Sequence, residues 1–274
     1  MTGAAAATGH DPALLQLVGL GKRFTSRSMF RGPEHTAALS NIDLAVPRGG
    51  CVGIVGESGS GKSTLVKCVL GLERPSAGEV WFERQRIDGR RRSVAHRGQI
   101  QPVFQNPMSS LNPRRRVGDS IADPMAVHTT ASRREREAEV ARLLELVGLP
   151  AAAAQRYPGQ LSGGQCQRVS IARALALKPK LIVADEATSA LDVLVQEQVI
   201  ELLHRLRTEL GMAILFVSHN LAVTRRLCVS IAVMHRGRIV EFNDADAIVK
   251  SPQHPYTQTL IGSVPTLLGR PSAV

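Results

Sequence analysis

Short apolar runs bounded by turn residues recur along the chain, and helical patterns lie between most of them. Four of these runs are expected to be buried strands, at residues 51–55, 181–184, 213–217 and 230–234. Apolar runs of this length fit strands that are covered on both faces. Their alternation with helical segments favours an α/β domain built around a mostly parallel central sheet.

Two helices carry clear end signals. Ser132 and Glu135 have the spacing of a capping box, apolar positions on one helix face follow them, and Gly148 stops the pattern. A second amphipathic pattern covers residues 193–210 and ends at Gly211. We therefore expect a capped helix before Gly148 and a core-facing helix over 193–210.

A hairpin is expected near the end of the chain. Residues 231–242 have the pattern of two short strands that turn at 235–237. Proline residues interrupt the chain beyond this hairpin. We therefore expect the last segment to lie at the periphery of the domain.

The composition is ordinary for a soluble globular protein. Of the 274 residues, 43% are hydrophobic and 21% are charged. No apolar run approaches the roughly 18 residues of a membrane-spanning helix, and the first ten residues lack the features of a secretory signal. We therefore place the chain in the cytoplasm. Its four cysteines have neither paired nor zinc-type spacing and are expected to be free buried thiols.

The net charge of +11 raises the question of a nucleic-acid partner. Arginine clusters occur, for example at residues 114–116 and 133–136. Acidic residues accompany the second cluster, however, and aromatic side chains that could stack on bases make up only 3% of the chain. Solvated faces, or attraction to an anionic membrane surface, account for these clusters better, so we expect no nucleic-acid partner.

A glycine-rich segment with the spacing of a phosphate-binding P-loop follows the first predicted buried strand. Its residues are Gly56, Glu57, Ser58, Gly59, Ser60, Gly61, Lys62, Ser63 and Thr64. The glycines let successive N–H groups point inward as an anion nest at the start of a helix. Lys62 is expected to reach the terminal phosphates of a nucleotide, Ser63 to bind Mg²⁺, and Thr64 to support the α-phosphate. A P-loop alone leaves kinases, GTPases and transport ATPases open.

Two adjacent carboxylates end the second predicted buried strand. Asp185 could help to hold Mg²⁺, largely through water, and Glu186 could act as the general base or orient the attacking water. Taken alone, this pair could also be two solvated acids in a turn. The P-loop upstream favours the catalytic interpretation.

Further motifs lie around these two sites in a fixed order. They are Gln105, the segment 161–165 with sequence LSGGQ, the segment 189–192 with sequence SALD, and His219 after a predicted strand. Together with the P-loop, this set resembles the ATP-binding subunits of ABC transporters. The LSGGQ segment resembles their signature motif, and Phe24 is similar in position to the aromatic residue that stacks on adenine.

The resemblance implies a P-loop NTPase core with a mostly parallel central sheet, an antiparallel β subdomain and a helical signature subdomain. It also implies a division of the chain. We expect a flexible N-terminus at 1–12, the ATPase domain at 13–250 with its helical subdomain at about 106–178, and a C-terminal tail at 251–274.

The resemblance also implies the roles of single residues. ATP would be bound by the P-loop together with Phe24, Gln105, Ser162, Gly163, Gly164, Gln165 and Asp192. Mg²⁺ would be held by Ser63, Gln105 and Asp185, and catalysis would rest on Lys62, Glu186 and His219. In such proteins two chains form a head-to-tail dimer, in which the signature of one chain covers the ATP on the P-loop of the other.

Three stretches resemble the importers of oligopeptides, dipeptides and nickel. They are residues 103–114, the pair 157–158, and the tetrapeptide HPYT at 254–257. Peptide import is therefore expected, with nickel or another small solute as the alternative. A soluble ABC ATPase that acts on DNA or ribosomes would usually carry coiled-coil insertions or tandem cassettes, and this sequence shows neither. The presence of Glu186 argues against a regulatory subunit that binds nucleotide without turnover.

The expected partners are two transmembrane permease subunits, a second ATPase subunit that is either identical or related, and indirectly an extracytoplasmic solute-binding protein. The chain would then lie on the cytoplasmic face of the inner membrane. It departs from the family pattern at Ala187, Asn220 and Cys166, where proline, aspartate and arginine are usual. The tail lacks a cysteine-rich extension, so no iron–sulfur cluster is expected.

Overall fold

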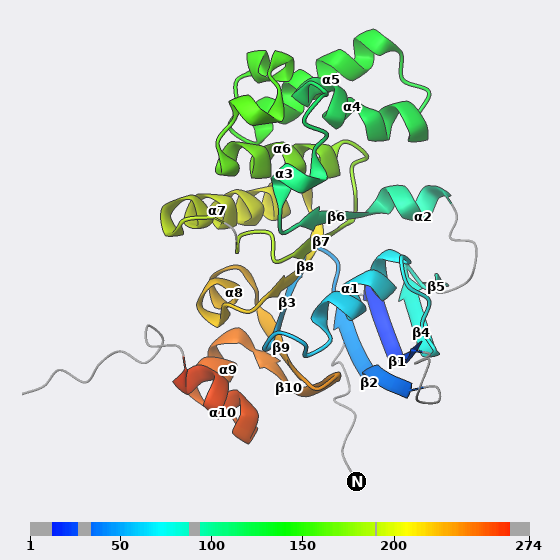
Figure 1. Ribbon diagram of the computed structural model, residues 1–274, viewed down its shortest axis with the longest axis vertical. Coiled ribbons are helices and arrows are strands. Elements are labelled where there is room, and N and C mark those ends of the chain that lie inside the picture. Colours follow the sequence, from blue (N-terminus) through cyan, green and yellow to red (C-terminus); the bar gives the residue numbers. More distant parts are fainter. Residues whose placement is uncertain (1–12, 27–33, 88–93, 190, 264–274) are drawn as a thin grey trace, which may run out of the picture.

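The computed structural model describes residues 13–26, 34–87, 94–189 and 191–263. The expected flexible N-terminus at 1–12 lies outside the described residues, as does the end of the tail from 264 onward. Two sheets and the helices that cover them make up the described part of the chain (Figure 1).

The central sheet has six strands in the order β10-β9-β3-β8-β7-β6. Their bounds are β3 (Cys51–Val55), β6 (Ile100–Phe104), β7 (Leu181–Asp185), β8 (Ala213–Ser218), β9 (Ser230–His235) and β10 (Arg238–Asp244). All neighbouring pairs are parallel except the β9–β10 hairpin. Strands β3 and β8 are buried along their whole length because both faces are covered. The four strands, the hairpin and the mostly parallel sheet predicted from the sequence are confirmed.

A second, antiparallel sheet has four strands in the order β2-β1-β4-β5. They are β1 (Leu15–Ser26), β2 (Glu34–Val46), β4 (Ala77–Phe82) and β5 (Gln85–Arg86). One apolar core joins this sheet to the central sheet and to helix α1 (Lys62–Leu70). The P-loop therefore lies between two sheets that share a core.

Helices and the loops between elements make up the rest of the described chain. The helices are α2 (Val94–Gln99), α3 (Pro107–Ser110), α4 (Val117–His128), α5 (Arg133–Leu146), α6 (Gly163–Leu175), α7 (Val193–Leu210), α8 (Leu221–Leu227), α9 (Ala245–Lys250), α10 (Pro255–Gly262) and the 3-10 turns η1 (Ala151–Gln155) and η2 (Pro158–Gln160). Helices α4, α5 and α6 lie together at one end of the molecule, above the central sheet in Figure 1.

The predicted helix ends are found in the structure. The Ser132 hydroxyl accepts the Glu135 N–H at 3.3 Å, and the Glu135 carboxylate accepts the Ser132 N–H at 2.6 Å, so the capping box at the start of α5 is complete. Helix α7 covers the predicted range and ends at Gly211, which has a positive φ of 63°. Glycine adopts that conformation at little cost.

The register of the central sheet places the predicted site residues in one row. Phe104 pairs with Asp185, Asp185 with Val217, and Val55 with Ser218. These residues stand at the carboxyl ends of neighbouring parallel strands, where ligands bind in open α/β sheets. The loops that begin there carry the P-loop, Gln105, Glu186 and His219.

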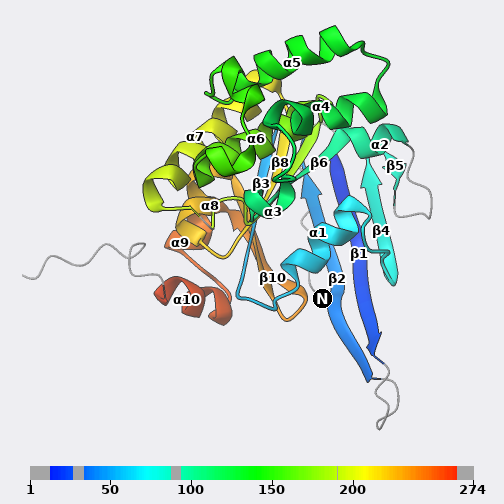
Figure 2. The same cartoon turned by 45° about the horizontal axis from the view of Figure 1, so that its top comes forward.

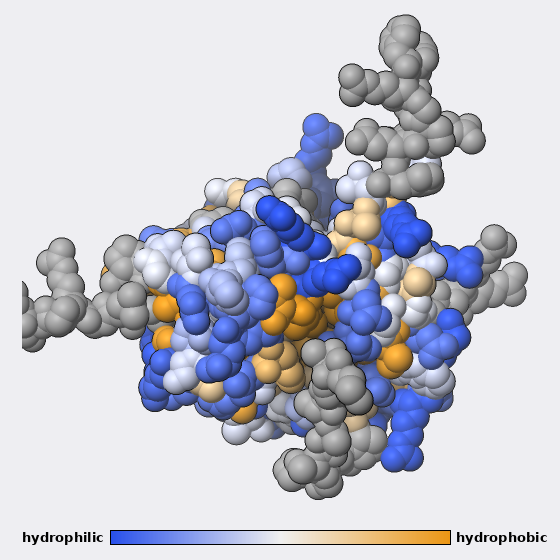
Figure 3. All heavy atoms as spheres, turned by 90° about the horizontal axis from the view of Figure 1, so that it is seen from below, coloured by the Kyte–Doolittle hydropathy of each residue, from blue (hydrophilic) through white to orange (hydrophobic). Residues whose placement is uncertain are grey.

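Seen from below the view of Figure 1, hydrophilic side chains cover most of the face, and apolar residues gather near its middle (Figure 3). Among the described residues, no helix combines the length and the hydropathy needed to cross a bilayer. The four cysteines are buried and none is in a disulfide, as predicted, but the fold brings the Sγ atoms of Cys51 and Cys228 to 3.0 Å from each other.

The matched substitutions Phe216→Ala and Phe242→Ala test the core. Phe216 is fully buried in β8, so its truncation is expected to lower the free energy of unfolding by about 3–5 kcal/mol. Phe242 in β10 is 49% exposed, and its truncation should cost less than about 1 kcal/mol. Urea denaturation measures both values. Equal losses would contradict the core described above.

Candidate functional site

The P-loop borders a cavity of about 330 Å³. The cavity is lined by the second half of the P-loop, by Glu186, by residues 36–38 of β2, and by Arg236 and Gly237 in the β9–β10 turn. The structure thus brings the predicted phosphate-binding loop and the predicted catalytic carboxylate together. It also adds two segments that the sequence did not point to.

Two glycines of the P-loop are required by close backbone approaches. Gly56 has a φ of 156°, and a Cβ there would lie 2.2 Å from the Met234 carbonyl oxygen. Gly61 has a φ of 107°, and a Cβ there would lie 2.7 Å from the carbonyl oxygen of Ala38. A side chain at either position would displace the loop from the two sheets. The loop then runs directly into α1, whose N-terminal end favours an anion.

The Lys62 ammonium is buried at the base of the cavity. Its Nζ donates to the carbonyl oxygens of Gly56 at 2.6 Å and Glu57 at 2.8 Å. Burial lowers the pKa of Lys62, and the nearby carboxylates of Glu186, Asp185 and Glu57 act in the opposite direction. The Lys62 ammonium is therefore held inside the loop, where bound phosphates would interact strongly with its positive charge.

Asp185 presents a buried oxygen that is available to a cation. Its Oδ1 accepts no hydrogen bond from the described residues. Burial raises the pKa of this carboxyl and the charge of Glu186 adds to the rise, while Lys62 and Lys67 oppose it. The unpartnered Asp185 oxygen and the Ser63 hydroxyl, which lines the P-loop cavity, are hard oxygen donors of the kind that Mg²⁺ prefers.

Glu186 is fixed by its backbone. It has a positive φ of 48°, and its N–H donates to the Val217 carbonyl oxygen at 2.8 Å. Its Oε2 lies 3.6 Å from Nδ1 of His219. The carboxylate therefore stands between the P-loop cavity and the imidazole, and the pair is an ion pair when His219 is protonated.

The departure from the family pattern at Asn220 has a structural explanation. The Asn220 side-chain oxygen accepts the N–H groups of Ala222 and Val223 and caps helix α8. Asparagine and aspartate are about equal as N-caps. The departure at Cys166 places a thiol in a fully buried position, where its Sγ lies 3.5 Å from the Pro158 carbonyl oxygen.

The signature segment forms a capped helix start outside the P-loop cavity. The Ser162 hydroxyl accepts the Gln165 N–H at 3.2 Å, and the Gln165 side chain accepts the Ser162 N–H at 3.0 Å. Ser162 and Gly163 are exposed, whereas Gly164 is buried against Val195 of α7. None of these residues lines the cavity. Within one chain, the structure does not bring the signature to the P-loop.

Other predicted ligand residues also lie outside the cavity lining, among them Gln105, Asp192 and Phe24. Gln105 is exposed directly after β6. Asp192 caps α7 by accepting the Val195 N–H at 3.0 Å. Phe24 is 40% exposed in β1, opposite Thr36, which does line the cavity.

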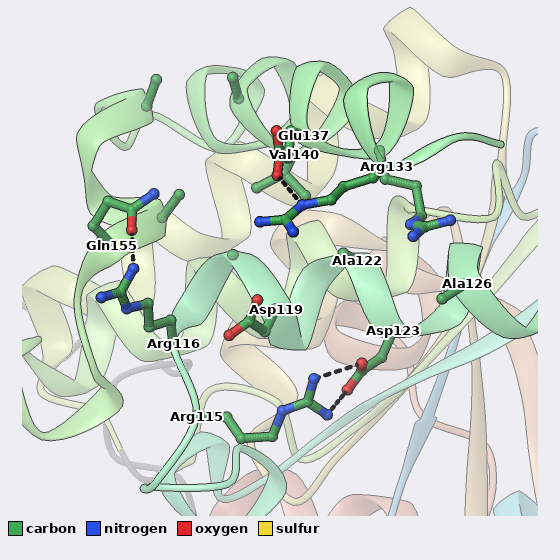
Figure 4. Close-up of a pocket in the computed structure, with 15 residues that line it drawn as sticks. Arg115, Arg116, Asp119, Ala122, Asp123, Ala126, Arg133, Glu137, Val140 and Gln155 are labelled. Carbon is green, nitrogen blue, oxygen red and sulfur yellow. Dashed lines mark hydrogen bonds and ion pairs between the residues drawn. The ribbon is translucent and has the colours of Figure 1, made fainter.

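A larger cavity, of about 730 Å³, lies between α4, α5 and η1 (Figure 4). Its arginines have partners nearby, since Arg115 pairs with Asp123 and Arg133 pairs with Glu137. The P-loop and Glu186 do not line it. The larger cavity is therefore not the candidate for catalysis. The smaller cavity is, because the P-loop and Glu186 line it.

The β9–β10 turn and the C-terminal helix are the parts of the site that the sequence analysis missed. The Gly237 N–H donates to the Ser60 carbonyl oxygen at 2.9 Å, although residues 235–237 were expected only to turn a hairpin. The segment after the hairpin was expected at the periphery, and α10 does lie at the edge of the molecule (Figure 1), but it also reaches the site. Tyr256 of α10 accepts the Glu57 N–H at 3.2 Å and so contacts the P-loop.

Comparison with known families agrees with this geometry. Residues 39–189, more than half of the chain, match the sequence model of the ABC transporter family. The chain belongs to the ABC transporter family. Residues 240–272 match a second model, described as the oligopeptide/dipeptide transporter C-terminal region.

Relatives of this ABC protein have peptide transport in their names. The chain is 42% identical, over 88% of its length and 76% of the relative, to the di/tripeptide transport ATP-binding protein DppF of Pseudomonas aeruginosa. It is also 42% identical, over 93% of its length and 81% of the relative, to the oligopeptide transport ATP-binding protein OppF of Lactococcus lactis.

Solved ABC cassettes share the fold. A dimeric post-hydrolysis state of the ATP-binding cassette MJ0796, bound to ADP and Pi, has a TM-score of 0.74 at 31% identity and covers 84% of this chain and 98% of its own. The cbiO1 structure from Clostridium perfringens has a TM-score of 0.76 at 27% identity and covers 88% and 93%. The predicted fold class and family are confirmed.

The contact between Gly164 and Val195 gives a test of the signature in this ABC protein. A Cβ on Gly164 would lie 2.4 Å from Val195 Cγ1, so Gly164→Ala is expected to cost about 1–3 kcal/mol of stability and to reduce ATP hydrolysis. Adding Val195→Ala removes the clashing methyl group and should restore most of both losses. Urea denaturation and a phosphate-release assay measure them. A double variant no better than Gly164→Ala would contradict the packing argument.

Proposed function

We propose that this chain is the ATP-hydrolysing subunit of an ABC importer that takes up peptides. One observation carries the chemical part of the proposal. The Glu186 carboxylate borders the P-loop cavity and lies 3.6 Å from His219, which is the arrangement needed to orient a water molecule beside a bound phosphate.

The P-loop binds the phosphates of ATP in this proposal. Its N–H groups and the N-terminal end of α1 stabilise the negative charge of the phosphates. Lys62 exchanges its two carbonyl partners, on Gly56 and Glu57, for phosphate oxygens. Because Lys62 is buried, its charge acts on the phosphates with little screening by water. Phe24 stacks on the adenine from strand β1, which pairs with the cavity-lining strand β2.

Mg²⁺ supplies charge neutralisation at the phosphates when it is bound. Ser63, Asp185 and Gln105 are the residues that would hold it, and the unpartnered Oδ1 of Asp185 supports this assignment. Asp185 would act in its ionised form, so the rise in its pKa on burial makes the site dependent on a nearby cation.

Glu186 and His219 carry out the catalytic step. Glu186 orients the attacking water and accepts its proton, and His219 stabilises the charge of the transferring phosphoryl group. Lys62 stabilises the same charge from the P-loop side. The strained backbone of Glu186, with its positive φ, keeps the carboxylate directed to this position.

A second ATPase chain completes the site. The signature residues form a helix start in which Ser162 and Gly163 are exposed, and none of them lines the P-loop cavity of the same chain. Asp192 lies at the start of the adjacent helix. A helix start that favours an anion, but lies away from the phosphate site of its own chain, fits a head-to-tail dimer in which it faces the phosphates on the other chain. The dimeric ABC cassette with ADP and Pi supports this arrangement.

Transport requires membrane partners. We propose two permease subunits, reached through the region around Gln105, and indirectly a solute-binding protein outside the membrane. The chain would then be peripheral on the cytoplasmic face of the inner membrane. Peptides are the proposed cargo because the relatives above carry peptide transport in their names and the C-terminal segment matches the oligopeptide/dipeptide model.

The substitution Glu186→Gln tests the catalytic assignment. It keeps the shape of the side chain but removes the base, so ATP hydrolysis is expected to fall by about 100-fold or more while ATP binding remains. An ATP-dependent dimer should accumulate, because the bound ATP is no longer consumed. Phosphate release, ATP binding and size-exclusion chromatography measure these effects.

Glu197→Gln is the matched control. Glu197 lies on the surface of α7 and pairs with Arg226, so its substitution should leave hydrolysis within about twofold of wild type. Normal hydrolysis by Glu186→Gln would exclude Glu186 as the catalytic base. Failure of the wild-type chain to bind ATP would exclude the proposed function.

A further inference from the structure

Helix α10 contacts the P-loop through Tyr256. The backbone N–H of Glu57, the second residue of the P-loop, donates to the Tyr256 hydroxyl at 3.2 Å, although 199 positions separate the two residues in the chain. The Tyr256 ring stacks on His235 at the end of β9, with ring centroids 3.9 Å apart and planes inclined by 10°. Both the ring and the hydroxyl of Tyr256 are therefore placed by specific contacts.

The HPYT segment fixes the position of this tyrosine. His254 caps α10 by accepting the Tyr256 N–H on Nδ1 at 3.1 Å, and Pro255 is the first helical residue. The Glu241 carboxylate accepts the N–H groups of Gln253 and His254, which ties the start of α10 to β10. The hydroxyl is thus held by a capped helix that is anchored on the central sheet.

The apolar face of α10 belongs to the same small core as the strand before the P-loop. Leu260 and Ile261 of α10 pack in a cluster that contains Val55, the last residue of β3, and Tyr256 packs against this cluster. In Figure 2, the P-loop segment between β3 and α1 runs to one end of the sheet, and α10 lies at that same end. The helix and the P-loop therefore share a packed support.

The hydrogen bond from Glu57 acts on the peptide group that also binds the P-loop lysine. The Gly56 carbonyl oxygen, on the same peptide plane as the Glu57 N–H, accepts Lys62 Nζ at 2.6 Å. Lys62 thus holds one end of this peptide group and Tyr256 holds the other. When Lys62 turns to phosphate oxygens, the Tyr256 hydroxyl is the partner that stays.

We propose that Tyr256 is a positioning residue for the ATP site. Its hydroxyl holds the Gly56–Glu57 peptide plane in the orientation from which the following N–H groups curl around the phosphates. This inference rests on the proposed function of the P-loop cavity as the ATP site. It assigns to the HPYT segment a direct role in nucleotide affinity.

The expected effect lies in binding rather than in chemistry. Without the hydroxyl, the ATP-free P-loop spends less time in its binding orientation, and the apparent affinity falls by the same fraction. Once nucleotide is bound, its phosphates hold the loop themselves. Loss of one neutral hydrogen bond corresponds to about a two- to tenfold change in an equilibrium constant. KM should therefore rise while kcat stays the same.

The test compares Tyr256→Phe with Thr259→Val in the full chain. Phenylalanine keeps the stack on His235 and removes only the hydroxyl. Thr259 is exposed on the same helix, and its hydroxyl donates to the Pro255 carbonyl oxygen at 3.1 Å. Calorimetry with MgADP gives Kd, a phosphate-release assay gives kcat and KM for ATP, and urea denaturation gives stability.

Tyr256→Phe is expected to raise Kd and KM by about two- to tenfold at unchanged kcat, and Thr259→Val is expected to change neither. Unchanged Kd and KM in Tyr256→Phe, with a wild-type chain that binds MgADP, would overturn this inference and leave the proposed function standing. A lower kcat at unchanged KM would overturn it as well, because the effect would then lie outside nucleotide binding. A wild-type chain that does not bind MgADP would overturn the proposed ATP site itself.

Discussion

The parallel pairing of β3, β8, β7 and β6 is the constraint on which the site depends. Because these strands run in one direction and in register, their carboxyl ends form one edge, with Val55, Asp185 and Phe104 at the last positions. The groups needed for phosphate binding, metal binding and water activation come from the loops that start there. A shift of one strand by a single residue would separate Asp185 and Glu186 from the P-loop.

The P-loop itself is held from several sides. Gly56 lies against the Met234 carbonyl, Gly237 donates to Ser60, and Tyr256 accepts from Glu57. Each of these contacts comes from the C-terminal part of the chain, between β9 and α10. A loop rich in glycine would lose much conformational entropy on binding phosphate, and these contacts reduce that loss by ordering it beforehand.

Much of the fold and the site could be predicted from sequence because the signals are local. The P-loop spacing, the carboxylates after an apolar strand and the capping box at Ser132 each lie within a few residues of sequence. The contacts of Gly237 and Tyr256 with the P-loop join residues far apart in the chain, and no local pattern encodes them. The close approach of Cys51 and Cys228 escaped prediction for the same reason.

If one ATP site is shared by two chains, two variants that are each inactive should complement each other when mixed. Lys62→Ala disables the P-loop. Gly163→Asp adds a carboxylate on the exposed signature, where a Cβ has its nearest neighbour at 3.8 Å, so the fold is preserved. We expect no hydrolysis by either variant alone and a clear part of the wild-type rate from the mixture. A mixture as inactive as its components, beside an active wild-type chain, would contradict a shared site.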